Sequence, residues 1–335
     1  MIVITGAAGF IGSRMVKHLN ESGRSDLVLV DNFPVTPVET CQGVTLQGEC
    51  ESLREFRYLE KIPRDLFFDW ASQNCQHISF IIHLGAETSV TNFDETLLVH
   101  YNLEFSQRLW SLAAMNRIPL LFAASSNYNT IKWYVNGATT EKKHGMAAEI
   151  RCEELKCRFD HWVLKQRVTP PLWAGFVLPE VYGFREQHKG LMASSVFHSL
   201  QQIIHRGKVV VPVFSQTESC EEPLADRIFV KDVVTIFTWF FNHIPASGFY
   251  ALTTGYPRPL SAVAKALFSF LKKEPDIEFL TLPFPDKMSR YGENMLPLNK
   301  LRRVGYKKSF TPLERGLHFY MNDLLKNTDM LKLLC

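Results

Sequence analysis

The sequence lacks the features that mark several large classes of protein. None of its apolar runs approaches the length of about 20 residues that a membrane-spanning helix needs. The seven cysteines are an odd number without a Cys-x-x-Cys pair, so neither a disulfide framework nor a zinc site is expected. Lys and Arg are spread along the chain and leave a net charge of +3, whereas a nucleic-acid surface would gather them into a basic stripe. We therefore expect no membrane, metal or nucleic-acid partner.

What the chain does contain is enough apolar material for a large core. Hydrophobic residues make up 46% of its 335 residues and charged residues 21%, which allows one large domain or two modest ones. The first apolar run begins at residue 2 and leaves no room for a signal peptide. We therefore expect a cytoplasmic protein.

The most informative segment is a glycine turn near the N-terminus. A β-branched apolar run, Ile2-Val-Ile-Thr5, is followed by Gly6, Gly9 and Gly12, and then by a segment with helical periodicity. Glycines at this spacing let the backbone of a strand-to-helix turn approach a pyrophosphate at a helix N-terminus. The segment therefore predicts a dinucleotide-binding turn.

A second apolar run supports this prediction. Leu27-Val-Leu-Val30 ends in Asp31, nineteen residues after Gly12, where an acidic side chain can hold the hydroxyls of an adenosine ribose. The alternative is a glycine turn that binds nothing, and the complete order of strand, turn, helix, strand and acid disfavours it.

Strand and helix patterns continue to alternate as far as about residue 183. Alternation of this kind predicts a doubly wound parallel sheet, an α/β fold whose ligands lie beyond the carboxyl ends of the strands. Gly6, Asp31, Gly85, Ser126 and Tyr182 all follow or end a predicted strand and are expected at that edge. We predict a dinucleotide-binding domain over 1–183, to which segments near 226–255 return. The remainder, 184–225 and 256–335, is predicted to form a smaller substrate-binding lobe.

The chain resembles the extended short-chain dehydrogenase/reductases. The motifs that carry the resemblance are Thr5-Gly-Ala-Ala-Gly-Phe-Ile-Gly12, Asp31-Asn32, His83-Leu-Gly-Ala86 and Ser125-Ser126. Within that superfamily, three further segments resemble the ADP-L-glycero-D-manno-heptose 6-epimerases of lipopolysaccharide assembly. They are Val181 to His198 with its His188-Lys-Gly190, Leu282 to Tyr291, and Leu301 to Gly316.

The resemblance implies an NADP- or NAD-dependent epimerase of a nucleotide-activated sugar, assembled as a homo-oligomer. A carbon of the sugar would be oxidised transiently and reduced again from its other face. The implied cofactor-binding residues are Gly6, Gly9, Phe10, Ile11, Gly12, Asp31, Asn32, Leu84, Gly85, Ala86 and Lys156. The implied catalytic residues are Ser126, Lys156, Lys189 and Cys152, which stands where the family has a tyrosine. Ser126, Lys189, His198 and Tyr291 are the implied substrate contacts.

The chain departs from that family at its acid/base position. The expected Tyr-x-x-x-Lys occurs as Cys152-x-x-x-Lys156, so that the lysine is present and the tyrosine is absent. In one interpretation, Lys156 pushes the thiol toward a thiolate that takes over proton transfer. In the other, Cys152 fills space and oxidation is lost, which leaves a catalytically impaired protein that still binds its ligands. A literal Tyr-x-x-x-Lys at Tyr128 to Lys132 is interpreted as a chance match.

Two departures concern the substrate side and two alternatives stay open. Glu180 stands where the family has an Asn, and a carboxylate there would repel a diphosphate, while the arginine expected at position 225 is found at 227. Asp31 favours NAD by its charge, whereas the resemblance leans toward NADP. A related reductase or 4,6-dehydratase is a further alternative, although Asn127-Tyr128 replaces the acidic pair of dehydratases.

Overall fold

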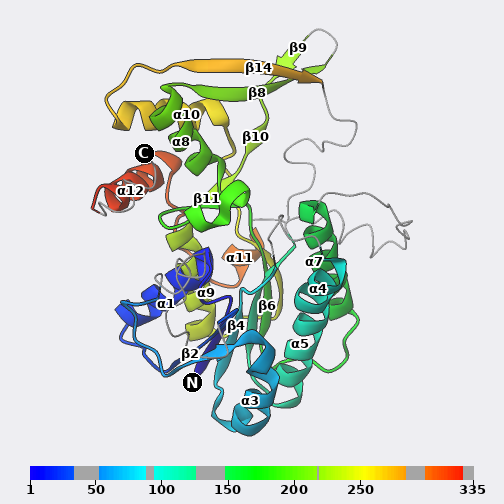
Figure 1. Cartoon of the computed structure of the whole chain (residues 1–335). Coiled ribbons are helices and arrows are strands. Elements are labelled where there is room, and N and C mark those ends of the chain that lie inside the picture. Colours follow the sequence, from blue (N-terminus) through cyan, green and yellow to red (C-terminus); the bar gives the residue numbers. More distant parts are fainter. Residues whose placement is uncertain (34–52, 88–93, 126–147, 217–218, 284–298, 327–335) are drawn as a thin grey trace. The chain divides into compact units, whose positions relative to one another are not determined.

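The computed structural model describes residues 1–33, 53–87, 94–125, 148–216, 219–283 and 299–326 (Figure 1). The chain divides into two compact units. The first comprises Met1–Val177, Val234–Ala251 and Asn299–Tyr306, and the second comprises Leu178–Val233, Leu252–Leu298 and Lys307–Cys335. Residues 299–306 thus lie in the first unit, outside the domain predicted for them, and the functions assigned to the two domains stay a prediction.

The first unit is built on a seven-stranded parallel sheet, which confirms the predicted doubly wound α/β fold. Its strand order is β12-β6-β5-β4-β1-β2-β3, with β1 at the point where the order reverses. Burial on both faces explains the near-continuous apolar runs of these strands, except for the polar edge strand β3. The strands are β1 (Ile2–Thr5), β2 (Leu27–Asp31), β3 (Glu60–Pro63), β4 (Phe80–His83), β5 (Leu120–Ala124), β6 (Trp173–Val177) and β12 (Gly248–Ala251).

Helices cover both faces of this sheet. Figure 1 shows α1 on one face together with α9, while α4, α5 and α7 pack on the other. Their bounds are α1 (Phe10–Glu21), α3 (Phe67–Asn74), α4 (Glu95–Val99), α5 (Phe105–Met115), α7 (Ala148–Leu164), α9 (Val230–His243) and α11 (Asn299–Arg303). Short 3-10 turns, η1 (Arg64–Leu66) and η2 (Cys75–His77), flank α3.

The apolar pattern of the sequence predicts a helix over 102–116, but the helical segment begins earlier. The Asp94 side chain caps α4 by accepting hydrogen bonds from the backbone N–H groups of Thr96, at 2.9 Å, and Leu97, at 3.4 Å. A π-helical segment, η3 (His100–Glu104), then joins α4 to α5. The wider π turn places the Asn102 side chain in a buried position, and a simple 3.6-residue period does not predict this.

The second unit contains three small sheets. The apolar pattern of the sequence predicts one strand over 173–178 that ends at 181–183. Instead, the short β7 (Glu180–Tyr182) pairs in parallel with β11 (Arg227–Phe229) and is a separate strand. The other strands are β8 (Val209–Gln216) between β9 (Ser219–Glu221) and β14 (Ile277–Pro283), and β10 (Leu224–Ala225) paired with β13 (Arg258–Pro259). The helices are η4 (Gln187–Met192), α8 (Ser195–Arg206), α10 (Leu260–Phe270) and α12 (Leu313–Leu325). Among the described residues, no helix is both long enough and apolar enough to cross a membrane.

Candidate functional site

The turn between β1 and α1 has room for backbone only. Gly6 adopts a φ of +69°, a conformation that L side chains rarely adopt. A Cβ added at Gly12 would lie 1.9 Å from the carbonyl oxygen of Gly6, and one added at Gly85 would lie 2.9 Å from the nitrogen of Gly6. A Cβ at Gly9 would meet the same oxygen at 3.2 Å. The three glycine positions around Gly6 therefore allow the close backbone packing that a tight strand-to-helix turn of this kind needs.

The first turn of α1 suits an anion. It contains no acidic residue, and Gly9 at its N-cap has no capping side chain, which leaves backbone N–H groups and the positive end of the helix dipole at the turn. Phe10 is buried and Ile11 is half-buried, so Phe10 offers mainly its backbone to a ligand at this place.

Asp31 ends β2 directly beside the glycine turn. Its Oδ2 accepts a hydrogen bond from the backbone N–H of Ala8 at 2.7 Å, and its Oδ1 accepts one from Asn32 at 2.8 Å. Burial raises the pKa of Asp31, and these two N–H groups oppose that rise by stabilising the carboxylate. Asn32 is exposed, and the role of Asp31 and Asn32 at the adenosine ribose stays a prediction.

Buried side-chain hydrogen bonds connect the end of β1, next to the turn, with β4 and α5. His83 Nδ1 lies 2.6 Å from Thr5 Oγ1, and His83 Nε2 lies 3.0 Å from Ser106 Oγ. Burial, together with the charge of Lys156, lowers the pKa of His83 to about 4, so the ring is neutral at pH 7. Thr5 Oγ1 also accepts a bond from the N–H of Gly85, in the half-buried segment Leu84–Ala86 that follows β4.

Cys152 is buried at the start of α7. The residue is only 5% exposed, and its Sγ donates a hydrogen bond to the backbone oxygen of Glu87 at 3.2 Å. The Asn102 side chain holds Glu87 in place, because its Oδ1 accepts from the Glu87 N–H at 2.6 Å and its Nδ2 donates to the Glu87 carbonyl at 2.9 Å. Burial raises the pKa of the Cys152 thiol although Lys156 lowers it. This net direction is opposite to the one that the thiolate interpretation requires.

A second cluster on α7 was not predicted from the sequence. Glu153 Oε2 accepts a hydrogen bond from Ser125 Oγ at 3.0 Å, and Glu153 Oε1 lies 3.3 Å from Lys156 Nζ. Ser125 is held further by Asp160, whose Oδ2 accepts from its N–H at 2.8 Å, and by Cys157, whose Sγ lies 2.8 Å from its Oγ. The spacing of three residues between Glu153 and Lys156 on a helix is the signal that could have found this pair.

Several predicted positions lie outside the described residues. These are Ser126, Tyr291, Asn127 and the Tyr128 to Lys132 match. Their predicted roles stay predictions.

In the second unit, Lys189 lies on η4 and is half-buried. Its backbone N–H bonds to the carbonyl of Glu186 at 3.0 Å. The buried Glu186 carboxylate accepts from the N–H groups of Gly183 and Ser194 and from the Ser194 hydroxyl, at 2.7 to 3.2 Å. These bonds tie η4 to the start of α8, which carries the half-buried His198 with its Nε2 3.3 Å from the carbonyl oxygen of Leu191. Both predicted residues therefore belong to one anchored segment.

Tyr182 does not fit the ligand-facing position predicted for it. Its side chain is buried within the second unit, and its hydroxyl donates to the carbonyl of Leu313 at 3.5 Å. A Cβ on Gly316 would lie 1.9 Å from that hydroxyl oxygen, so the tyrosine fills the space left by a glycine on α12. Its role here is packing.

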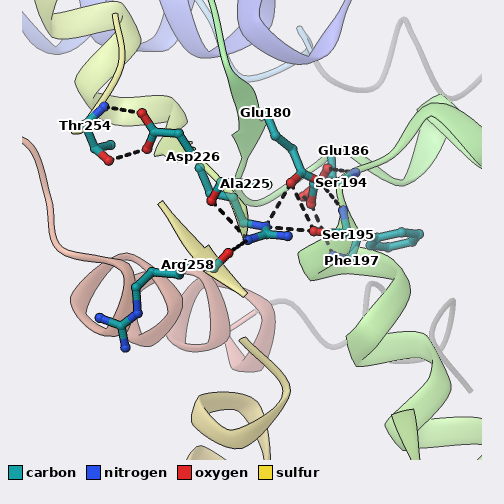
Figure 2. Close-up of polar contacts among 10 residues, drawn as sticks. Glu180, Glu186, Ser194, Ser195, Phe197, Ala225, Asp226, Thr254 and Arg258 are labelled. Carbon is teal, nitrogen blue, oxygen red and sulfur yellow. Dashed lines mark hydrogen bonds and ion pairs between the residues drawn. The ribbon is translucent and has the colours of Figure 1, made fainter. Parts of the chain in front are cut away.

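The Glu180 carboxylate, which was expected to repel a diphosphate, pairs with an arginine of the same unit. Glu180 Oε2 lies 2.8 Å from Arg227 Nε, and both Glu180 oxygens accept bonds from Ser195, one from its N–H and one from its hydroxyl (Figure 2). Arg227 also donates to the Ser195 hydroxyl at 2.9 Å and to the carbonyl of Arg258 at 2.8 Å. The two departures from the family pattern, the half-buried Glu180 and the buried Arg227, thus form one ion pair.

A family model and a curated relative both match this chain to epimerases. The model of the NAD dependent epimerase/dehydratase family matches residues 2–251. An ADP-L-glycero-D-manno-heptose-6-epimerase of Fusobacterium nucleatum is 30% identical, covering 98% of this chain and 99% of that protein.

Solved structures show the same fold. The Helicobacter pylori ADP-L-glycero-D-manno-heptose-6-epimerase has a TM-score of 0.72 at 20% identity, covering 97% of this chain and 96% of its own. A Thermus thermophilus UDP-glucose 4-epimerase in complex with NAD has a TM-score of 0.66 at 18% identity, covering 96% and 97%.

Proposed function

Because the chain belongs to the NAD-dependent epimerase/dehydratase family, we propose that it is an enzyme that inverts one carbon of a nucleotide-activated sugar. The observation that carries this proposal is the 30% identity to a heptose epimerase over 98% of the chain. That similarity includes the second unit, to which we assign the sugar, as well as the first, to which we assign the cofactor.

The substrate that we propose is ADP-heptose, inverted at C6 during synthesis of lipopolysaccharide precursors. The name of the relative supports it, and so does the His188-Lys-Gly190 segment, which carries the family resemblance on the substrate side. We further propose that the protein is a homo-oligomer, as the resemblance implies, and that it is cytoplasmic.

The residues of the first unit fit a dinucleotide. Gly6, Gly9 and Gly12 would receive the pyrophosphate, and Asp31 would accept bonds from the adenosine ribose. The carboxylate of Asp31 favours NAD, because the 2′-phosphate of NADP would bring a second negative charge beside it. When bound, NAD supplies a reversible hydride acceptor for the sugar carbon. Lys156 and Lys189 are the cations proposed to hold the nicotinamide ribose and to act on the sugar, respectively.

A second candidate function is binding of cofactor and nucleotide sugar without turnover. A specific observation favours it: the thiol at the tyrosine position is buried and donates to the Glu87 carbonyl. A buried thiol whose pKa is raised is a poor proton acceptor at neutral pH.

The experiment that separates the two candidates uses each 6-epimer of ADP-heptose. Purified protein with NAD bound is incubated with one epimer at a time, and interconversion is followed by NMR. The epimerase proposal predicts the same equilibrium mixture from either starting epimer. If neither epimer is converted while both still bind in a calorimetric titration, the second candidate is correct.

A further inference from the structure

We propose that the Glu153 carboxylate, and not the Cys152 thiol, is the proton acceptor and donor of this enzyme. This inference rests on the proposed function, since it concerns how the sugar hydroxyl loses and regains its proton. It assigns to Glu153 a catalytic role that the resemblance gives to a tyrosine at the preceding position.

The contacts of Glu153 carry the proposal. One of its oxygens accepts a hydrogen bond from the Ser125 hydroxyl at 3.0 Å, and the other lies 3.3 Å from the Lys156 ammonium. An acid/base group of this family is expected between a serine hydroxyl and a lysine, because the hydroxyl donates to it and the cation stabilises its anionic form. Ser126, the serine predicted for this role, lies outside the described residues. Among the described residues, Glu153 holds a corresponding place between the neighbouring Ser125 and Lys156.

The position of Ser125 is itself well defined. It follows β5 directly, is fully buried, and is held through its N–H by Asp160 at 2.8 Å. The carboxyl edge of a parallel sheet is where ligands of this fold lie. A carboxylate bonded to Ser125 is therefore held at the edge where the cofactor turn also opens.

Reach and accessibility distinguish Glu153 from Cys152. The Glu153 side chain is 30% exposed, whereas Cys152 is only 5% exposed and its thiol points to the Glu87 carbonyl. A thiol is one bond from Cβ, far short of a tyrosine hydroxyl, while a carboxylate oxygen extends two bonds further than the thiol. Glu153 therefore has the reach and the exposure to meet a substrate, which Cys152 lacks.

Glu153 takes the proton of the sugar hydroxyl and later returns it. The O–H bond of that hydroxyl breaks and its proton binds a Glu153 oxygen, and the electron pair left on the oxygen completes the C=O bond as the carbon gives up its hydrogen as a hydride. An oxidised nicotinamide dinucleotide, when bound, would accept that hydride and, once reduced, would supply it to the other face of the carbonyl. The oxygen then takes back the proton from Glu153.

The test compares five proteins of the whole chain: wild type, Glu153→Gln, Cys152→Tyr, the Cys152→Tyr/Glu153→Gln double variant and the control Glu154→Gln. Epimerisation of ADP-heptose is measured with NAD saturating. Glu153→Gln is expected to lower turnover by about 100-fold or more, the size of a general acid–base contribution. The introduced tyrosine should make the double variant active again, and the neighbouring Glu154→Gln should match wild type.

Other outcomes overturn the proposal in distinguishable ways. If wild type is inactive and Cys152→Tyr is active, the substrate assignment stands and Glu153 is not the acid/base. An active wild type with an equally active Glu153→Gln also removes Glu153 from the reaction. If all five proteins are inactive on ADP-heptose, the proposed function fails and the role of Glu153 fails with it.

A second readout needs neither cofactor nor turnover. Burial is the largest cause that raises the pKa of Cys152, while the charge of Lys156 lowers it and the charge of Glu153 raises it. Removing the Glu153 charge in Glu153→Gln should therefore speed alkylation of Cys152 by iodoacetamide about threefold or more, as resolved by peptide mass spectrometry. An alkylation rate unchanged from wild type means that the Glu153 carboxylate does not act near residue 152, where the acid/base group belongs, and this overturns the proposal. Glu154→Gln should leave the rate unchanged.

Discussion

The glycine turn after β1 and the first two turns of α7 belong to the same unit of the molecule, yet they meet the family pattern to very different degrees. At the turn, Gly12 packs against the Gly6 backbone and Asp31 accepts a hydrogen bond from Ala8, and we propose these residues as the dinucleotide site. On α7, the tyrosine is replaced by a buried cysteine, and a carboxylate from the next residue bonds with Ser125 and Lys156.

The difference teaches that binding and proton transfer make separate demands on a structure. The turn needs backbone space and N–H groups, which glycine spacing alone provides. Proton transfer needs one group of suitable pKa within reach of the reacting oxygen, and more than one side-chain type can supply it. An intact cofactor turn is therefore no measure of the state of the acid/base centre.

The largest effect is expected from a substitution in the glycine turn. Gly12→Ala would put a Cβ 1.9 Å from the Gly6 carbonyl oxygen. We expect loss of measurable NAD binding in calorimetry and a free energy of unfolding in urea lower by about 3 kcal/mol or more. Gly9→Ala, whose Cβ would meet the same oxygen at 3.2 Å, should be clearly milder. Wild-type NAD affinity in Gly12→Ala would contradict the assignment.

The buried neutral ring of His83 should make the folded protein less stable in acid. The His83 pKa is about 4 in the folded protein and 6.5 in the unfolded chain. As pH falls from 6.5 to 4, the unfolded chain binds the proton first, so the free energy of unfolding should fall by up to about 3 kcal/mol.

The matched variant for this measurement is His83→Gln, which is less stable at pH 7 but lacks this titration. Subtracting its urea-unfolding curves from those of wild type, pH by pH, removes the contributions of the other titrating groups. A difference that does not change between pH 7 and 4 would show that His83 is not buried as a neutral ring.

A smaller effect is expected at the ribose position. Asp31→Asn removes the charge beside Ala8 and should weaken NAD binding by about 10- to 100-fold, the worth of hydrogen bonds to a charged group. It should also narrow the preference for NAD over NADP. Asp26→Asn, which breaks only the surface ion pair with Arg24, should change neither affinity in calorimetric titrations. Equal effects of the two variants would remove Asp31 from the cofactor site.

The smallest effect is expected on α7. In Cys152→Ser the hydroxyl can still donate to the Glu87 carbonyl, so stability should change little. If Glu153 transfers the proton, turnover on ADP-heptose should stay within about threefold of wild type, far below a general acid–base loss. A fall as large as that predicted for Glu153→Gln would return the role to the thiol and remove the contrast between the two residues.

Much of the fold and of the cofactor side could be predicted from the sequence. Short apolar runs predict buried parallel strands, and the spacing of Gly6, Gly9 and Gly12 predicts the turn, because both are local demands on backbone and burial. Lys156 could be placed on α7 for the same reason. The start of α4 was missed because a cap by Asp94 and a π-helical segment set it, and the packing role of Tyr182 was missed because it depends on Gly316, far along the chain.

The sequence by itself determined that the chain has a dinucleotide turn and lacks the expected tyrosine. Only the tertiary structure decided what surrounds the position of the missing tyrosine. Cys152 donates to the Glu87 carbonyl, which also accepts from Asn102, and Glu153 accepts from Ser125, 28 residues earlier in the chain. The tertiary structure also paired Glu180 with Arg227, which are 47 residues apart in the sequence. The physical reason is that a glycine acts through its own backbone, whereas the charge and the pKa of a side chain depend on neighbours that the fold brings from elsewhere.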